Sequence, residues 1–190
     1  FPKAWQNLGD LYMSADRPRD AVSAFREANR RNPNQAETLL NLGYAYDLSG
    51  QRELAIQTYF RMLEHHPGAI DVRHNLAVIA YESGQTANAR AMVAELLRLA
   101  PKDPAAREMK AKLDAIGHTP VVTPPQSSAT YRRCREANEA AAAGRLSEAI
   151  AELRTASWLD EKSSLPHHYL ANVYYRTGRI DDAIAHQKRA

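Results

Sequence analysis

The sequence repeats itself every 34 residues, and this period constrains the fold more than any other feature. Prolines, leucines, alanines and asparagines all recur at this spacing. The recurring positions are Pro33, Pro67 and Pro101; Leu8, Leu42 and Leu76; Ala21, Ala55 and Ala89; and Asn7, Asn41 and Asn75. One such unit cannot bury its apolar face alone, so neighbouring units must stack. The period therefore predicts an array of stacked repeats.

Inside each period, the apolar residues follow the spacing of two helices. The first stripe is Trp5, Leu8 and Tyr12, and the second is Ala21, Phe25 and Ala28. A break falls between them at Asp16 and Pro18, and proline suits the first turn of a following helix. The sequence therefore predicts an all-α fold, an α-solenoid built from antiparallel helix pairs.

These stripes resemble the signature of the tetratricopeptide repeat. The first repeat reads Trp5-x2-Leu8-Gly9-x2-Tyr12, then Ala21-x3-Phe25-x2-Ala28 and Pro33. The second repeat matches closely, and the third is weaker because Arg73 replaces the aromatic residue and Ala77 the glycine. The resemblance implies a right-handed superhelix of about five repeats, with a concave groove that binds peptide segments.

We expect two arrays, separated by an insert. The first array holds repeats 2–35, 36–69 and 70–103, followed by a capping helix over 104–116 with Asp103 as its N-cap. A Pro/Ser-rich linker follows over 117–129, and a second array then holds repeats 130–163 and 164–190. Because the fifth repeat stops inside its second helix at Ala190, we expect this array to continue. One continuous superhelix with a looped-out insert is the alternative.

The groove should be lined by the first helix of each pair. If Trp5 faces the core, Asn7 points about 200° away, into the groove. Asparagines at this position of each repeat would form a ladder, because a carboxamide can both donate to and accept from a peptide backbone. The ladder is similar to the asparagines of the repeat domain of O-linked N-acetylglucosamine transferases. The alternative is that asparagine is merely common at this position. The predicted peptide-binding residues are Asn7, Asp10, Leu40, Asn41, Tyr44, Asp71, Asn75, Val78 and Tyr81, and the same register also places Gln6 in the groove.

Charge indicates what the first groove binds. Its positions carry one lysine and five acids, Asp10, Glu37, Asp47, Asp71 and Glu82, although the whole chain has a formal net charge of +3. We therefore expect a basic, extended peptide. The basic clamp of repeats that bind chaperone C-termini is missing, since only Asn41 agrees with it, and this mode is rejected.

The second groove has a different composition, with aromatic and basic residues and no acid. Such a surface suits a peptide, an acidic one included, better than single-stranded nucleic acid. The predicted residues are Arg135, Asn138, His168, Tyr169, Asn172, Tyr175 and Arg176, with Cys134 and Ala141 in the same register. Neighbouring arginines could lower the pKa of Cys134, but no histidine is positioned to make it a nucleophile.

The sequence predicts no catalytic site, no metal site and no cofactor. The adjacent pairs His65-His66 and His167-His168 point apart on a helix, and a single cysteine excludes an all-Cys site. We therefore expect a non-enzymatic scaffold that binds another protein or peptide, with no membrane and no nucleic acid as partner. The alternatives are the substrate-recruiting region of a larger enzyme, such as a glycosyltransferase, and a homo-oligomer formed through the repeat ends. The cytoplasm is the default compartment.

Overall fold

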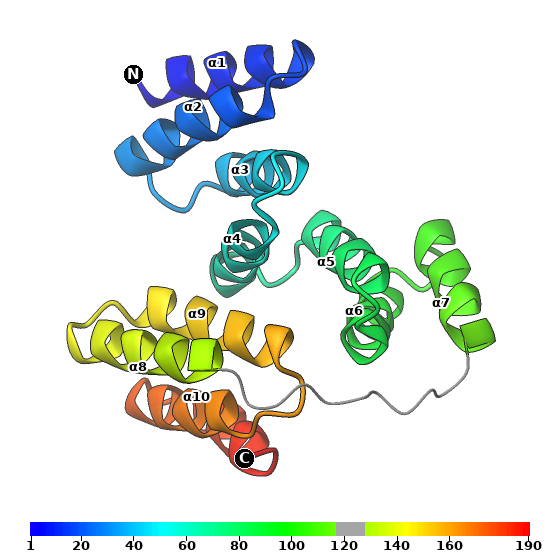
Figure 1. Cartoon of the computed structure of the whole chain (residues 1–190), viewed down its shortest axis with the longest axis vertical. Coiled ribbons are helices and arrows are strands. Elements are labelled where there is room, and N and C mark those ends of the chain that lie inside the picture. Colours follow the sequence, from blue (N-terminus) through cyan, green and yellow to red (C-terminus); the bar gives the residue numbers. More distant parts are fainter. Residues whose placement is uncertain (117–127) are drawn as a thin grey trace. The chain divides into compact units, whose positions relative to one another are not determined.

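The computed structural model describes residues 1–116 and 128–190, and these residues form eleven helices and no strand (Figure 1). The first seven helices are α1 (Pro2–Ser14), α2 (Pro18–Arg31), α3 (Ala36–Leu48), α4 (Arg52–His65), α5 (Ile70–Glu82), α6 (Thr86–Leu99) and α7 (Pro104–Ile116). The other four are α8 (Ser128–Ala142), α9 (Leu146–Leu159), α10 (Leu165–Arg176) and α11 (Ile180–Gln187). The predicted all-helical solenoid is confirmed.

The chain divides into two compact units, a first unit over Phe1–Thr119 and a second unit over Pro120–Ala190. In the first unit, α1–α6 form three helix pairs, and α7 packs against α6; in the second, α8–α11 form two pairs. Most of the predicted linker, 117–127, lies outside the described residues. Its last two residues were assigned wrongly, because α8 already begins at Ser128.

Two glycines set the distance between paired helices. A Cβ at Gly9 would lie 2.3 Å from Phe25 Cε1, and a Cβ at Gly43 would lie 2.3 Å from Tyr59 Cε1. Such separations are far below ordinary van der Waals contact. Both rings are fully buried, so glycine here lets the first helix of the pair lie directly against an aromatic ring of the second.

The turn inside each pair also uses one recurring conformation. The same position has positive φ in all five pairs, where it is occupied by Asp16, Gly50, Gly84, Gly144 and Gly178. Glycine adopts this left-handed region without steric cost, and Asp is among the residues that tolerate it best. The turn residue therefore gives a fixed reference point for comparing repeats.

Helix α7 is held in place at its start and along one face. The Asp103 carboxylate accepts a hydrogen bond from the Ala106 backbone N–H at 2.7 Å, which is the geometry of an N-cap. Ala106 and Leu113 are fully buried, although Ile116 is 42% exposed. The helix therefore covers the third pair through a narrow face.

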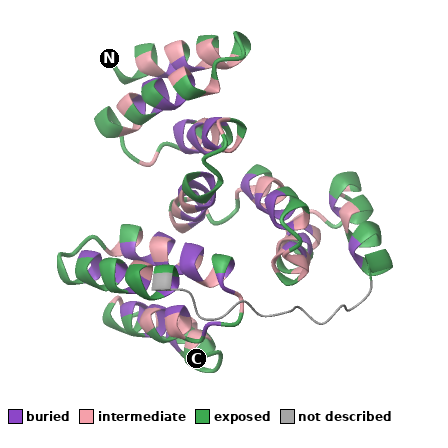
Figure 2. Ribbon diagram, in the orientation of Figure 1, coloured by how far each residue is buried: buried purple, intermediate pink, exposed green. Residues whose placement is uncertain are grey.

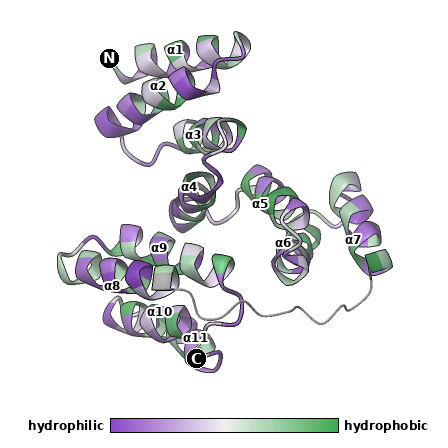
Figure 3. Ribbon diagram, in the orientation of Figure 1, coloured by the Kyte–Doolittle hydropathy of each residue, from purple (hydrophilic) through white to green (hydrophobic). Residues whose placement is uncertain are grey.

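Buried positions lie between helices, and exposed positions face outward, in each unit (Figure 2). Hydrophobic residues follow the buried faces of the helices, and hydrophilic residues follow the exposed faces (Figure 3). In the second unit the core is built largely from small side chains of α8 and α9, joined by Leu153, Leu170 and Tyr174.

Candidate peptide-binding groove

All nine predicted residues of the first groove lie on α1, α3 and α5. Four of them are exposed and five are half-buried. The exposed ones are Asn7, Tyr44, Asp71 and Val78, and the half-buried ones are Asp10, Leu40, Asn41, Asn75 and Tyr81. Three apolar side chains on α3 and α5 face solvent, with exposed fractions of 47% for Tyr44, 52% for Leu48 and 40% for Val78.

The three ladder asparagines do not have equivalent surroundings, although the sequence analysis places all three in the groove. Asn7 is exposed, but Asn41 Nδ2 donates a hydrogen bond to Asp10 Oδ1 of the preceding repeat at 3.0 Å. Asn75 Nδ2 donates to the hydroxyl of the buried Tyr59 at 3.0 Å. Two of the carboxamides therefore also hold the array together. Each bond leaves one N–H and the carbonyl oxygen of its carboxamide for a ligand.

Ion pairs change the charge of the groove. Arg52 donates to Asp47 at 3.1 Å and to Glu82 at 2.7 Å, so one cation from α4 joins two of the five acids. Burial raises the pKa of the Asp10 carboxyl; the Asn41 hydrogen bond opposes this rise, and the nearby Glu37 charge adds to it. Arg52 therefore offsets part of the negative charge that residue counting assigns to the groove, while Glu37 and Asp71 remain exposed.

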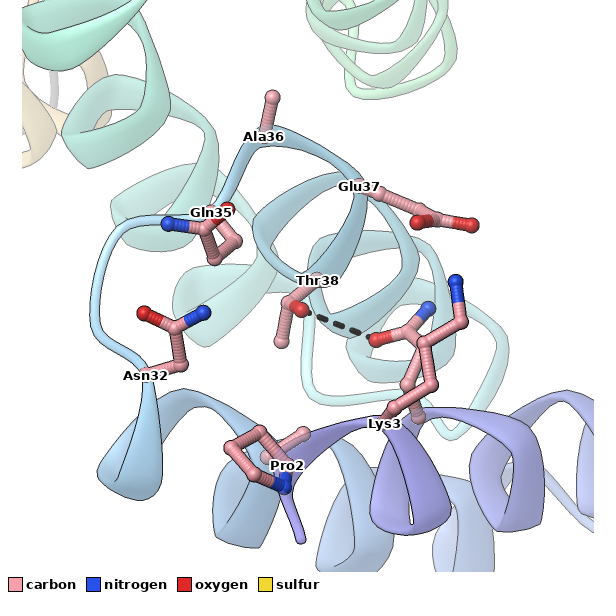
Figure 4. Close-up of a pocket in the computed structure, with 9 residues that line it drawn as sticks. Pro2, Lys3, Asn32, Gln35, Ala36, Glu37 and Thr38 are labelled. Atoms are coloured by element: carbon pink, nitrogen blue, oxygen red, sulfur yellow. Dashed lines mark hydrogen bonds between the residues drawn. The ribbon is translucent and has the colours of Figure 1, made fainter.

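A pocket of about 460 Å³ opens where the start of α1 and the end of α2 meet the start of α3. Lys3 and Glu37 lie on one side of it, and Asn32 and Gln35 on the other (Figure 4). Gln6 also lines it, and its placement in the open groove was wrong, because only 5% of this residue is exposed. Its Oε1 accepts from Thr38 Oγ1 at 2.9 Å, whereas its Nε2 is buried without a hydrogen-bond partner. Packing by α3 covers this side chain.

The seven predicted residues of the second groove lie on α8 and α10. All are exposed except the half-buried Tyr169. Glu139, one turn after Arg135 and outside the predicted groove positions, lies 3.7 Å from its guanidinium. His168, Asn172 and Tyr175 also line a pocket of about 390 Å³ that they share with Ile180 and Ile184 of α11.

Two further residues of the second register were placed wrongly. Cys134 and Ala141 belong to the core, with exposed fractions of 0% and 1%. Helix α8 lacks the bulky residues of the signature, so it packs through Cys134 and several alanines. Burial raises the pKa of the Cys134 thiol to about 11, despite the opposing charge of Arg133. This thiol is therefore not an activated nucleophile.

One contact between titratable groups was not foreseen. His167 Nδ1 lies 3.0 Å from His186 Nδ1, across 19 positions of sequence, and His167 Nε2 lies 3.3 Å from Ser157 Oγ. No adjacent-histidine or i, i+4 spacing marks such a pair. Within residues 1–116 and 128–190, no group of three or more His, Cys, Asp or Glu side chains could hold a metal ion. None of the helices in these ranges is both long and apolar enough to cross a membrane.

The repeats belong to a known family. Two family models, both described as tetratricopeptide repeat, match residues 7–70 and 48–113. Residues 7–113 are therefore an array of tetratricopeptide repeats. Proteins built from these repeats typically mediate protein–protein interactions and are typically non-enzymatic scaffolds.

Similar proteins agree with this fold. Over 77 residues the chain is 35% identical to the peroxisomal targeting signal receptor of Saccharomyces cerevisiae, a match that spans 40% of this chain and 13% of the receptor. Among solved structures, MamA 41-end from Desulfovibrio magneticus RS-1 has a TM-score of 0.58 at 16% identity, over 99% of this chain and 92% of that one. A thermophilic TPR protein in Thermus thermophilus has a TM-score of 0.52 at 18% identity, over 100% and 90%. At these identities the solved structures show the fold alone.

Proposed function

We propose that the first unit binds an extended, basic segment of another protein in the groove formed by α1, α3 and α5. The observation that carries this proposal is the exposure of Tyr44, Leu48 and Val78 on successive groove helices. Such apolar side chains gain free energy when a ligand covers them. The acids Glu37 and Asp71 stand on the same helices, where they favour lysine or arginine in the bound segment.

In this proposal, the asparagines form hydrogen bonds with the backbone of the bound segment. Neighbouring helix pairs are about 8–10 Å apart, and an extended chain advances about 3.3 Å per residue, so one asparagine meets roughly every third ligand residue. Asn7 offers its whole carboxamide, and Asn41 and Asn75 offer the N–H and carbonyl that their internal bonds leave over. A grip on the backbone accepts many sequences, while the acids select for charge.

The similarity to a receptor for a targeting signal supports recognition of a segment of another protein. A substrate-recruiting region of a larger enzyme would use the same groove, and that alternative remains a prediction. In either case the bound segment lies along α1, α3 and α5.

Fluorescence anisotropy can test the proposal. The probes are a labelled peptide of about ten residues rich in Lys and Val, and the same peptide with Glu in place of Lys. We expect the basic peptide to bind more tightly, and its affinity to fall with added salt, because exposed charges are screened over about 10 Å at 0.1 M ionic strength. Equal affinity for both peptides would refute the charge selection.

Two variants locate the binding surface. Asn7→Ala removes an exposed groove side chain. It should lower the affinity for the basic peptide several-fold, since one neutral hydrogen bond contributes roughly 0.5–1.5 kcal/mol. Ser23→Ala is the matched control, because Ser23 is also exposed but lies on α2, the second helix of its pair. If both variants bind like the wild type, the groove asparagine does not contact the ligand.

A further inference from the structure

Helix α7 takes the place of the first helix of a fourth repeat. Its first and last residues each lie 34 positions after those of α5, and 34 is the period of the repeats. Its two buried residues, Ala106 and Leu113, are equivalent to Val72 and Ile79 of α5, which are buried as well. Helix α7 therefore packs on the preceding pair with the same face as α5.

The loops that precede α5 and α7 are held by the same contact. Arg73 of α5 donates a hydrogen bond to the Pro67 carbonyl at 2.6 Å, and Arg107 of α7 donates one to the Pro101 carbonyl at 3.1 Å. Both members of the second pair lie 34 positions after those of the first. This shared anchor orients α7 relative to its loop as α5 is oriented, so α7 continues the series α1, α3 and α5.

The face of α7 that would receive a second helix is polar instead. Lys110 and Asp114 stand where α5 carries the buried Leu76 and Ala80. Both residues are exposed, and they form an ion pair with each other. A polar outer face is what ends an array of repeats, so α7 is the helix that closes the first unit.

The groove face of α7 keeps apolar side chains. On α3 this face carries Asn41, Tyr44 and Leu48. The residues two periods later, on α7, are Met109, Lys112 and Ile116. Ile116 is 42% exposed, against 52% for Leu48, and Met109 is half-buried like Asn41. The exposed apolar side chains of the groove therefore extend beyond α5 to α7, the fourth helix of the series.

Lys112 supplies a positive charge at this end of the groove. The pKa of its ammonium is raised, chiefly by Glu108 and in addition by Tyr81 of α5, so this lysine lies close to a predicted groove residue. Its ion pair with Glu108 spans 2.7 Å, but the two side chains are 52% and 68% exposed. Exposed pairs of this kind contribute little to stability, so a ligand carboxylate can compete with Glu108 for Lys112.

We propose that the segment bound along α1, α3 and α5 continues across α7, where it places an apolar side chain on Met109 and Ile116 and an acidic side chain on Lys112. This inference rests on the function proposed above and adds a second charge preference to it. The segment is basic over Glu37 and Asp71 and acidic at α7. Because each groove helix meets about three ligand residues, the fourth helix lengthens the bound segment from about nine residues to about twelve.

Fluorescence anisotropy on the 190-residue chain tests this extension. The reference probe is the basic peptide of about ten residues used above, with both termini blocked. Two longer probes add Val-Leu-Glu, one at the amino end and the other at the carboxyl end. We expect one of the two to bind about tenfold more tightly than the reference, because α7 covers an added apolar side chain. The end that gives the gain also shows the direction of the bound chain.

A charge exchange separates a contact with Lys112 from general attraction to the groove. The better long probe is compared with the same probe carrying Lys in place of its added Glu. General attraction to an acidic groove favours the Lys probe, whereas Lys112 favours the Glu probe. Lys112→Glu should reverse the preference. Arg98→Glu is the matched control, because Arg98 is also exposed and paired with a glutamate of its own helix but lies on α6. It should bind both probes like the wild type.

The outcomes distinguish this inference from the function on which it rests. If the reference peptide binds but neither long probe gains affinity, or if the Lys probe is preferred, the inference is overturned and the proposed function stands. If no probe binds, both are overturned. Ile116→Ser should remove much of the gain of the long probe and keep the affinity for the reference, and a gain that survives unchanged would also overturn the inference. Circular dichroism on every variant checks that the helices are retained.

Discussion

The Gly43→Ala variant tests how closely α3 and α4 approach. The added Cβ would lie 2.3 Å from Tyr59 Cε1 and 2.7 Å from Cδ1. Tyr59 is fully buried, and its hydroxyl accepts from Asn75, so the ring cannot move aside freely. Overpacking costs about 1–3 kcal/mol, and a displaced hydrogen bond adds roughly 0.5–1.5 kcal/mol. The higher helix propensity of alanine offsets about 1 kcal/mol. We therefore expect the free energy of unfolding to fall by about 0.5–3.5 kcal/mol.

Urea unfolding followed by circular dichroism measures this change. A control variant, Gly50→Ala, separates packing from backbone strain. Gly50 has φ of +81°, and an added Cβ would meet nothing within 4 Å, so its cost of about 1 kcal/mol comes from the left-handed backbone. Replacing Tyr59 by Leu should rescue part of the loss in Gly43→Ala and none of the loss in Gly50→Ala, which a double-mutant cycle would reveal. A Gly43→Ala protein as stable as the wild type would refute the steric argument.

Three further predictions concern the core and titration. Leu42→Ala should lower the free energy of unfolding by about 2–5 kcal/mol, because only 5% of Leu42 is exposed at the middle of the first unit, and urea unfolding measures the loss. Cys134 should resist iodoacetamide at about pH 8 in the native state and react on unfolding, because burial raises its pKa to about 11; mass spectrometry detects the adduct. Burial and His167 lower the pKa of His186 to about 4, below its unfolded value of about 6.5. Between about pH 6.5 and pH 4 the unfolded chain therefore binds more protons than the folded chain, so the second unit should lose stability as pH falls through this range. The loss should be smaller in His186→Asn. Trp158 fluorescence follows the unfolding of both proteins.

The helix pairs could be predicted from the sequence because the spacing of residues close together in the chain determines them. Trp5, Gly9 and Phe25 belong to stripes at fixed spacing, and each helix needs only its own stripe to define its buried face. The cap of α7 was predictable for the same reason, since Asp103 bonds a backbone N–H three residues away.

The polar contacts of the groove could not be predicted, because they join side chains from different helices. The bonds of Asn41 to Asp10 and of Asn75 to Tyr59 cross 31 and 16 positions of sequence. These bonds form only at a particular displacement of one helix pair along the next, and the residue pattern of a single helix does not determine this displacement. The error at Cys134 repeats the error at Gln6, because both residues lie ten positions before the turn residue of their pair and both are buried, with exposed fractions of 0% and 5%. The rotation that was assigned to the first helix of each pair therefore placed this position too far into the groove.

The three ladder asparagines therefore share one position but not one role. We expect the exposed Asn7 to contribute to ligand binding alone, so its removal should leave stability unchanged. Asn75 also satisfies the hydroxyl of Tyr59, whose burial raises the pKa of this phenol and makes an unpaired state costly. Its removal should weaken both the array and the peptide complex. Asn41 lies between these cases, because its partner Asp10 is half-buried and can regain hydrogen bonds from water. A ligand that orders the groove should consequently stabilise the first unit against unfolding, and most strongly where its backbone contacts the carboxamides that already join one repeat to the next.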